Sequence, residues 1–147
     1  MVREAVPGDA PVIEALYREL VADSSIRVRP EQVATISALP TSYLLVAELE
    51  GAVCATVLLT ICPDLMYGTQ PFGLLENVVV AEAMRGRGLG RLLLARAEEL
   101  LVAHDGTKLM LLSSVAREAA HGFFRRCGFA SDRKLAFVKY RRQFAAE

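Results

Sequence analysis

The sequence is poor in the residues that form disulfide frameworks and metal centres. It has three cysteines, two histidines and no tryptophan among 147 residues. Cys54, Cys62 and Cys127 lie far apart and form no CxxC pair, which is typical of reduced thiols in a cytoplasmic protein. Two histidines cannot supply a multi-histidine metal site. We therefore expect a cytoplasmic protein with no structural disulfide and no metal.

The chain also lacks an excess of charge of either sign. Lysine plus arginine and aspartate plus glutamate both number 17, which does not favour a nucleic-acid binder or a membrane-surface protein. The most apolar stretch, residues 43–62, is interrupted by Glu48, Glu50 and Gly51, so it is not expected to span a membrane. The first ten residues are charged and show no signal-peptide pattern. We expect no nucleic-acid partner and no membrane partner.

What is present is a composition typical of a folded domain. Hydrophobic residues make up 53% of the chain and charged residues 23%, and no repeat or low-complexity tract divides it. A chain of this length can bury a core without covalent cross-links. We therefore predict one domain over residues 1–147.

Helices are predicted where apolar residues recur at helical spacing between residues that start or stop a helix. Asp9 is expected to cap the first helix, and Gly128 is expected to follow the last one as its C′ residue. The predicted helices cover residues 9–21, 30–39, 89–104 and 118–127.

Strands are predicted from short apolar, β-branched runs bounded by turn residues. Glu50-Gly51 predicts a hairpin turn between two of them, and their near-continuous apolar character favours strands covered on both faces. The predicted strands cover residues 2–5, 43–48, 52–61, 74–80, 108–112 and 134–140. Early hairpins followed by strand–helix–strand order indicate a mixed α/β fold.

A glycine-rich turn joins the fourth predicted strand to the long helix. Gly86, Gly88 and Gly90 alternate where that helix begins, which brings several free backbone N–H groups to a helix N-terminus suited to an anion. Three arginines, Arg85, Arg87 and Arg91, add forked donors for phosphate oxygens.

The turn matches neither of two common nucleotide-binding patterns. No lysine follows the glycines as in a P-loop, and Arg91 stands where the third glycine of a dinucleotide fingerprint belongs. A tight strand-to-helix turn without a ligand is the alternative interpretation. Binding of an unrelated nucleotide or phosphate is another.

Two motifs together resemble the GNAT superfamily of N-acetyltransferases. Arg85-x-x-Gly88-x-Gly90 is similar to the family's acetyl-CoA pyrophosphate loop, and AHGFFRRCGF, from Ala120 to Phe129, is similar to its A-x-x-F-Y-x-x-x-G-F segment. Residues 1–70 match only in the pattern of elements. The resemblance implies an α/β (mixed α+β) GNAT-like fold, with a mostly antiparallel sheet of about six to seven strands flanked by about four helices. It also implies acetyl-CoA as co-substrate.

The resemblance further implies which residues hold the cofactor. In the family, the strand before the loop splays from its neighbour, and its free backbone groups would bind the pantetheine arm. Amides of the loop would bind the pyrophosphate. The later helix would flank the thioester end. In this sequence the strand residues are Val78, Val79 and Val80, and the helix residues are Arg117, Ala120 and Phe124. The loop residues are Arg85, Gly86, Arg87, Gly88, Leu89, Gly90 and Arg91.

Glu76 is the expected general base. An alkylamine has a pKa of about 10, so a group in the site must take a proton before the nitrogen can attack the thioester. Glu76 lies in an apolar strand, two residues before Val78, and alternation predicts that both side chains share a sheet face while Asn77 points to the other as a structural hydrogen-bonder. A salt-bridged structural glutamate is the alternative. A backbone N–H near Val78 is the expected oxyanion donor.

The sequence departs from the family where the thiolate would be protonated. Phe124 stands in place of the usual tyrosine and cannot donate a proton, and Arg117 stands in place of a frequent asparagine. Either the thiolate departs into water unaided or another group serves. The candidate donors are Tyr67, Ser114, Cys127 and Tyr140.

Both histidines favour structural roles. For His121 a surface or capping role is preferred to catalysis, and His104 is expected to be a favourable cation at a helix C-terminus. The loop at residues 62–72 carries Met66, Tyr67 and Phe72, which are interpreted as lining an acceptor pocket, forming a subunit contact or packing on the first helices.

The sequence thus favours an N-acetyltransferase acting on a primary amine of a small molecule. A peptide or protein acceptor is the nearest variant. A catalytically weak acyl-CoA-binding regulatory module is the alternative from another class, supported by Phe124. A homodimer is expected because similar proteins often form one.

Overall fold

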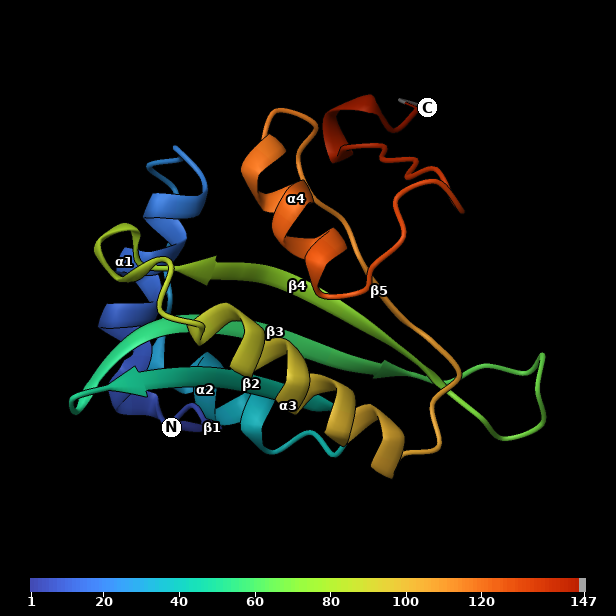
Figure 1. Cartoon of the computed structure of the whole chain (residues 1–147), viewed down its shortest axis with the longest axis horizontal. Helices are drawn as coiled ribbons and strands as arrows, with labels where there is room; N and C mark the ends of the chain where they lie inside the picture. Colours follow the sequence, from blue (N-terminus) through green and yellow to red (C-terminus); the bar gives the residue numbers. More distant parts are fainter. Residues whose placement is uncertain (146–147) are drawn as a thin grey trace. The chain divides into compact units, whose positions relative to one another are not determined.

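The computed structural model describes residues 1–145 and groups the chain into two compact units, Met1–Leu111 and the part from Leu112 onward. Figure 1 labels the elements. That residues 1–147 act as one domain stays a prediction.

The first unit is built on a five-stranded sheet in the order β1-β2-β3-β4-β5. The pairs β1–β2, β2–β3 and β3–β4 are antiparallel, and β5 runs parallel to β4. The strands are β1 (Val2–Glu4), β2 (Ser42–Leu49), β3 (Ala52–Cys62), β4 (Phe72–Val80) and β5 (Leu109–Leu111). The mixed α/β class and the mostly antiparallel sheet are confirmed.

The hairpin between β2 and β3 forms where the sequence predicts it. Glu50 and Gly51 both have positive φ, 53° and 81°, as a two-residue turn that matches strand twist requires. Both strands are buried along most of their length, which confirms that the sheet is covered on both faces.

Helices cover the two faces of this sheet. α1 (Ala10–Leu20) and α2 (Pro30–Ser37) pack on the face that carries Leu44 and Val46. α3 (Leu89–Ala103) packs on the other face, where its Leu101 lies against Gly73 of β4. Figure 1 shows α3 crossing in front of the sheet, on the side away from α1 and α2. Two short 3₁₀ turns, η1 (Pro7–Asp9) and η2 (Glu82–Met84), precede α1 and follow β4.

The core is centred on β2 and β3, between the two helical layers. Leu45, Val57 and Leu59 are fully buried, and burial of each such side chain contributes about 1.5–3 kcal/mol. Thr56 is also fully buried, and its hydroxyl donates to the Leu45 carbonyl at 2.8 Å. No polar side chain is therefore left unsatisfied at this point of the core.

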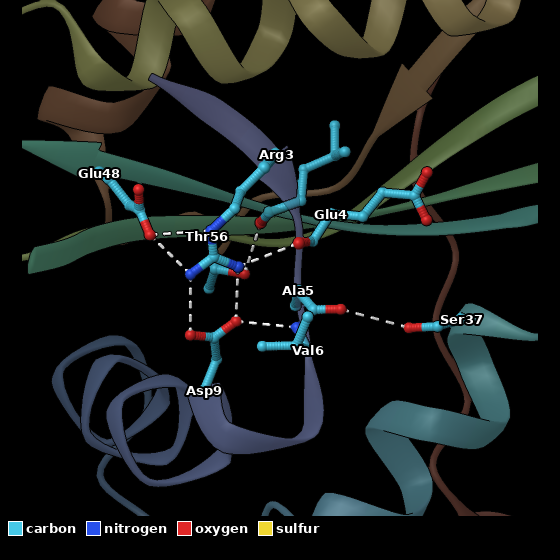
Figure 2. Close-up of polar contacts among 9 residues, drawn as sticks. Arg3, Glu4, Ala5, Val6, Asp9, Ser37, Glu48 and Thr56 are labelled. Carbon is cyan, nitrogen blue, oxygen red and sulfur yellow. Dashed lines mark hydrogen bonds and ion pairs between the residues drawn. The ribbon is translucent and has the colours of Figure 1, made fainter. Parts of the chain in front are cut away.

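A charge network ties the N-terminus to the sheet (Figure 2). The Arg3 guanidinium donates to Asp9 Oδ2 at 2.8 Å and, through Nε, to Glu48 Oε1 at 2.8 Å. Asp9 Oδ2 also accepts the Val6 N–H at 2.8 Å. α1 begins at Ala10 as predicted, but the Asp9 carboxylate makes no cap to that helix, because it is turned back toward Arg3 and Val6. The expected N-cap bond is therefore wrong.

The second unit contains α4 (Glu118–Arg126) and the short 3₁₀ turn η3 (Arg141–Gln143). α4 ends as predicted: Gly128 has φ 94°, and the Phe129 N–H donates to the Phe124 carbonyl at 3.1 Å. Phe124 is the buried residue of the helix and packs on Phe123 and Phe129.

The predicted strand at residues 134–140 is absent from the described chain. The segment has no regular structure, and Leu135 and Phe137 are 81% and 90% exposed. Alternation of apolar residues forms a strand only where a neighbouring strand accepts its hydrogen bonds, and none pairs with this segment. Over residues 1–145 the sheet accordingly has five strands rather than six to seven.

Candidate active site

A β-bulge interrupts β4 at its centre. Leu58 of β3 pairs with Glu76, but Thr56, two residues earlier, pairs with Val79, so β4 carries one extra residue. Asn77 has φ 56°, in the left-handed region that asparagine tolerates better than most residues. Glu76 and Val79 therefore share a face of the sheet. The prediction that Glu76 and Val78 share one is wrong, because the bulge breaks the two-residue alternation.

The bulge is held to α1 by a side-chain hydrogen bond between Asn77 and Tyr17. Burial raises the pKa of the Tyr17 hydroxyl, and the hydrogen bond with Asn77 acts in the opposite direction. Asn77 is thus a structural hydrogen-bonder as expected, but it points toward α1 and not to the opposite face. Tyr17 was missed by the sequence reasoning. Its place four residues after the buried Ile13, on the inward side of α1, is the signal that could have found it.

Glu76 is exposed to solvent within the first unit. Across residues 1–145 no cation forms an ion pair with it. The salt-bridged alternative is therefore not what the structure has, and the exposed carboxylate is solvated rather than paired.

The two strands at this edge of the sheet separate just before the bulge. β4 pairs with β5 only over Gly73–Leu75, opposite Leu109–Leu111, whereas β4 continues to Val80. In the described chain, residues 76–80 therefore have no strand partner on the edge away from β3. Val79 is buried, and Val78 and Val80 are half-buried. An unpaired edge of this kind can accept an extended ligand as an added strand.

The glycine-rich turn follows this edge directly. Gly86 and Gly88 have φ values of 76° and 80°, which explains why glycine is needed at both positions. A Cβ at either one would meet no atom within 4 Å, so the space above them is open. Gly88 is the N-cap of α3 and offers no side chain to its first turn, which leaves N–H groups of that turn for a ligand.

Positive charge surrounds the same turn. Arg85, Arg87 and Arg91 are exposed, and no carboxylate among residues 1–145 forms an ion pair with them. Arg85 Nε donates to the Val80 carbonyl at 3.3 Å, which joins the turn to the end of β4. Leu89 and Gly90 are buried, so they position the helix while the residues before them face solvent.

The candidate residues of the second unit are held by contacts inside that unit. Arg117 is the N-cap residue of α4 and is half-buried, as is Ala120. Phe124 is buried, and its ring contacts those of Phe123 and Phe129 in the same unit. His121 Nε2 lies 2.8 Å from the Ser114 carbonyl, which fits the capping role preferred for it.

The sequence profile described as the Acetyltransferase (GNAT) family matches residues 13–129. This chain belongs to that family. The resemblance noted in the sequence is thereby confirmed. No curated protein matches the sequence.

Solved structures of GNAT proteins share the fold. A putative acetyltransferase from Agrobacterium tumefaciens str. C58 has a TM-score of 0.85 and 33% identity over 95% of this chain and 99% of its own. Glucosamine-6-phosphate N-acetyltransferase from Arabidopsis thaliana has a TM-score of 0.80 and 23% identity over 96% and 97%. AAC(6′)-Iy, solved with a bisubstrate analogue of CoA, has a TM-score of 0.79 and 16% identity over 96% and 97%. The predicted GNAT-like fold is confirmed.

The remaining polar candidates of this GNAT protein either contact another side chain or are at least partly exposed. His104 Nε2 lies 2.7 Å from the Tyr43 hydroxyl, at the C-terminal end of α3. The candidate proton donors Ser114, Tyr67 and Tyr140 are exposed and Cys127 is half-buried. Their roles stay predictions.

The loop before β4 does not pack on the first helices. Leu65, Met66 and Tyr67 are all exposed, which makes that interpretation of the loop wrong. Phe72 at its end lies under the Lys108 ammonium, 5.4 Å from the ring centroid. An acceptor-facing role and a subunit contact stay open for this loop.

The described residues contain neither a membrane-spanning helix nor a metal-binding cluster. No helix in the described chain has the length and apolarity to cross a lipid bilayer. Within residues 1–145 no cluster of three or more histidine, cysteine, aspartate or glutamate side chains could hold a metal ion.

Proposed function

We propose that this GNAT-family protein is an N-acetyltransferase that moves the acetyl group of acetyl-CoA to a primary amine of a small molecule. The observation that carries the proposal is one arrangement within the first unit. The unpaired edge of β4 runs directly into a glycine turn at the N-terminus of α3, with three arginines around it. An extended arm followed by a diphosphate is the ligand that such an edge and turn suit.

In this proposal each part of the cofactor has its own protein groups. Backbone groups of Val78, Val79 and Val80 bind the pantetheine amides. The N–H groups of residues 85–91 bind the pyrophosphate, and the arginine side chains among them neutralise its charge. Arg117, Ala120 and Phe124 are proposed to flank the thioester end, with Phe124 supporting α4 from inside its own unit.

Glu76 is proposed as the general base. Its carboxylate takes a proton from the ammonium group of the acceptor, directly or through a water. The neutral nitrogen then attacks the thioester carbon, and a backbone N–H near Val78 donates to the oxygen that becomes negative. When the C–S bond breaks, the attacking nitrogen loses its second proton to water and becomes the neutral amide, and the thiolate takes up a proton from water or from Tyr67, Ser114, Cys127 or Tyr140.

A free-thiol assay over a panel of amines tests the proposal. Wild-type protein should release CoA with at least one amine, and Glu76→Gln should lower that rate by about 10²–10⁴-fold, as for loss of a general base. Affinity for acetyl-CoA, measured by calorimetry, should stay unchanged in this variant. Glu98→Gln is the matched control, because Glu98 is exposed on α3 and should leave both quantities unchanged.

The second candidate function is an acyl-CoA-binding regulatory module without turnover. The observation that favours it is Phe124, which offers no proton to a leaving thiolate and is buried. Tight binding of acetyl-CoA with no thiol release from any amine or peptide of the panel would support this module against the enzyme. Thiol release from peptides alone would support a peptide N-acetyltransferase.

We also propose that the protein is cytoplasmic and forms a homodimer. Cys54, Cys62 and Cys127 are all free thiols, as a reducing compartment requires. Light scattering coupled to size-exclusion chromatography measures the oligomeric state, and a monomer mass at micromolar concentration would rule the dimer out.

A further inference from the structure

A cavity of about 360 Å³ lies between α1 and α2 on the sheet face that they cover. Leu44 and Leu58 contribute from the sheet, and Ile13 and Val33 contribute from the two helices. Its volume falls within the lower range of small-ligand pockets. An apolar body of modest size, such as one ring, is what this cavity suits.

The sheet side of the cavity lies one strand away from the residue proposed as general base. Leu58, which lines the cavity, is the cross-strand partner of Glu76, and such partners have side chains about 4.5–5.5 Å apart at Cβ. Tyr17 also lines the cavity, and it is the residue that hydrogen-bonds Asn77 in the bulge. The sheet wall of the cavity is therefore next to the strand position that carries Glu76.

Two arginines line another part of the same cavity, Arg27 and Arg29. Both are exposed. Arg27 Nη1 donates to the carbonyls of Ser24 at 3.1 Å and Ile26 at 2.6 Å, which fixes its position. Arg29 makes no ion pair with any carboxylate of residues 1–145.

The backbone that carries Arg27 is anchored on α1. Glu14 Oε2 accepts the Val28 N–H at 2.9 Å, and Arg18 Nη2 donates to the Ile26 carbonyl at 3.3 Å. Glu14 also interacts electrostatically with Arg27, and it is paired with Arg18 at 2.8 Å. The guanidinium groups are thus displayed by a fixed segment, with the neighbouring acid occupied.

We propose that the acceptor amine carries an apolar body and, at its far end, a carboxylate or phosphate group that Arg27 and Arg29 bind. This inference rests on the proposed function, and it names the substrate class of that site. The amine lies beside Glu76, the body fills the cavity, and the anion meets the guanidinium groups, which suit planar or tetrahedral oxyanions. An amine with a neutral far end gains only the apolar contacts.

Three probes that share one benzylamine body test the proposal: 4-(aminomethyl)benzoate, 4-(aminomethyl)benzylphosphonate and 4-(aminomethyl)benzamide. The wild-type protein should acetylate at least one anionic probe with a kcat/KM about tenfold above that of the amide, the scale of a charge-assisted hydrogen bond. Which anion leads distinguishes a carboxylate acceptor from a phosphate acceptor. Binding of each probe to the protein with CoA is measured in parallel by calorimetry.

Arg29→Gln should reduce the preference for the anionic probe to about twofold or less, and Arg29→Lys should retain part of it. Arg96→Gln is the matched control, because Arg96 is exposed on α3 and pairs with Glu99, and it should leave the tenfold preference unchanged. Thermal unfolding of all three variants confirms that they are folded.

The outcomes separate this inference from the proposed function. Turnover of all three probes at equal kcat/KM, or a preference that Arg29→Gln leaves intact, overturns the anion-binding role while the acetyltransferase proposal stands. Arginine-dependent binding of an anionic probe with no thiol release from any probe contradicts the acetyltransferase proposal and, with it, the acceptor role given to the bound amine. If neither anionic probe binds or reacts in preference to the amide, the inference is overturned.

Discussion

The two units of the chain differ in how they use their apolar residues. The first buries them between helices on both faces of a sheet, and almost every core residue belongs to it. Among the described residues of the second, Phe124 is the one large side chain that is buried, whereas Leu135, Phe137 and Phe144 are exposed. Two apolar layers around β2 and β3 stabilise the first unit through contacts between residues distant in sequence. In the second unit, Phe124 contacts Phe123 and Phe129, which are close to it in sequence. The unit that carries β4 and the glycine turn is therefore the stable scaffold of this protein.

Replacing one leucine in each unit gives the largest expected contrast. Leu59→Ala removes a fully buried side chain of β3 and should lower the free energy of unfolding by about 2–5 kcal/mol. Leu135→Ala removes an 81% exposed side chain and should change it by less than about 0.5 kcal/mol. Urea unfolding of both variants measures the contrast. Equal costs would show that the second unit buries Leu135 in solution.

Breaking the Arg3 network should have an intermediate effect confined to the first unit. Arg3→Met leaves Asp9 largely buried without its cation and should destabilise the unit by about 1–3 kcal/mol. Hydrogen exchange should detect the loss in β1 and β2 and not in α4. If amide protection from hydrogen exchange fell equally in both units, the effect of the network would not be confined to the first unit.

The same network should make stability depend on pH. Arg3 holds the pKa of Asp9 below its usual value of 3.8, so the folded state binds this proton less readily than the unfolded state. The stabilisation is therefore present above about pH 4 and is lost as the pH falls through the folded pKa. The difference in unfolding free energy between wild type and Arg3→Met should narrow below pH 4. A difference in unfolding free energy that stays constant with pH would mean that the ion pair with Asp9 is not how Arg3 stabilises the protein.

The smallest effect is expected at the bulge. Tyr17→Phe removes the hydrogen bond with Asn77 and should cost about 0.5–1.5 kcal/mol of stability. Tyr43→Phe, which removes the contact with His104, is the matched control away from the bulge. If the bulge positions Glu76, only Tyr17→Phe should also slow thiol release. Equal rates of thiol release in the two variants would show that the bulge does not position Glu76.

Much of the first unit could be predicted because its signals are local. Glu50-Gly51 predicts its turn from backbone preferences alone, and Gly86 and Gly88 predict the positive-φ turn before α3 for the same reason. The anion site at that turn stays a prediction. The long apolar runs of β2 and β3 predict strands covered on both faces. These features depend on residues that are close in sequence.

The remaining features depend on partners that are distant in sequence. One extra residue at Asn77 leaves the apolar pattern of β4 intact, so the bulge and the changed face of Val78 were not predictable from alternation. The contact between Asn77 and Tyr17 joins two elements far apart in the chain. Residues 134–140 show the converse, because an alternating pattern forms no strand without a neighbour to pair with.

The central claim is that the edge of β4 and the turn at residues 85–91 bind acetyl-CoA, and the most direct measurement is calorimetric titration of Gly88→Val beside Gly68→Val. Both glycines have positive φ, 80° and 68°, with open space around a Cβ, so the two variants carry similar backbone strain. We predict that Gly88→Val weakens acetyl-CoA binding by on the order of tenfold or more, whereas Gly68→Val, in the loop before β4, binds as the wild type does. Equal affinity in both variants, with both folded, would contradict the claim.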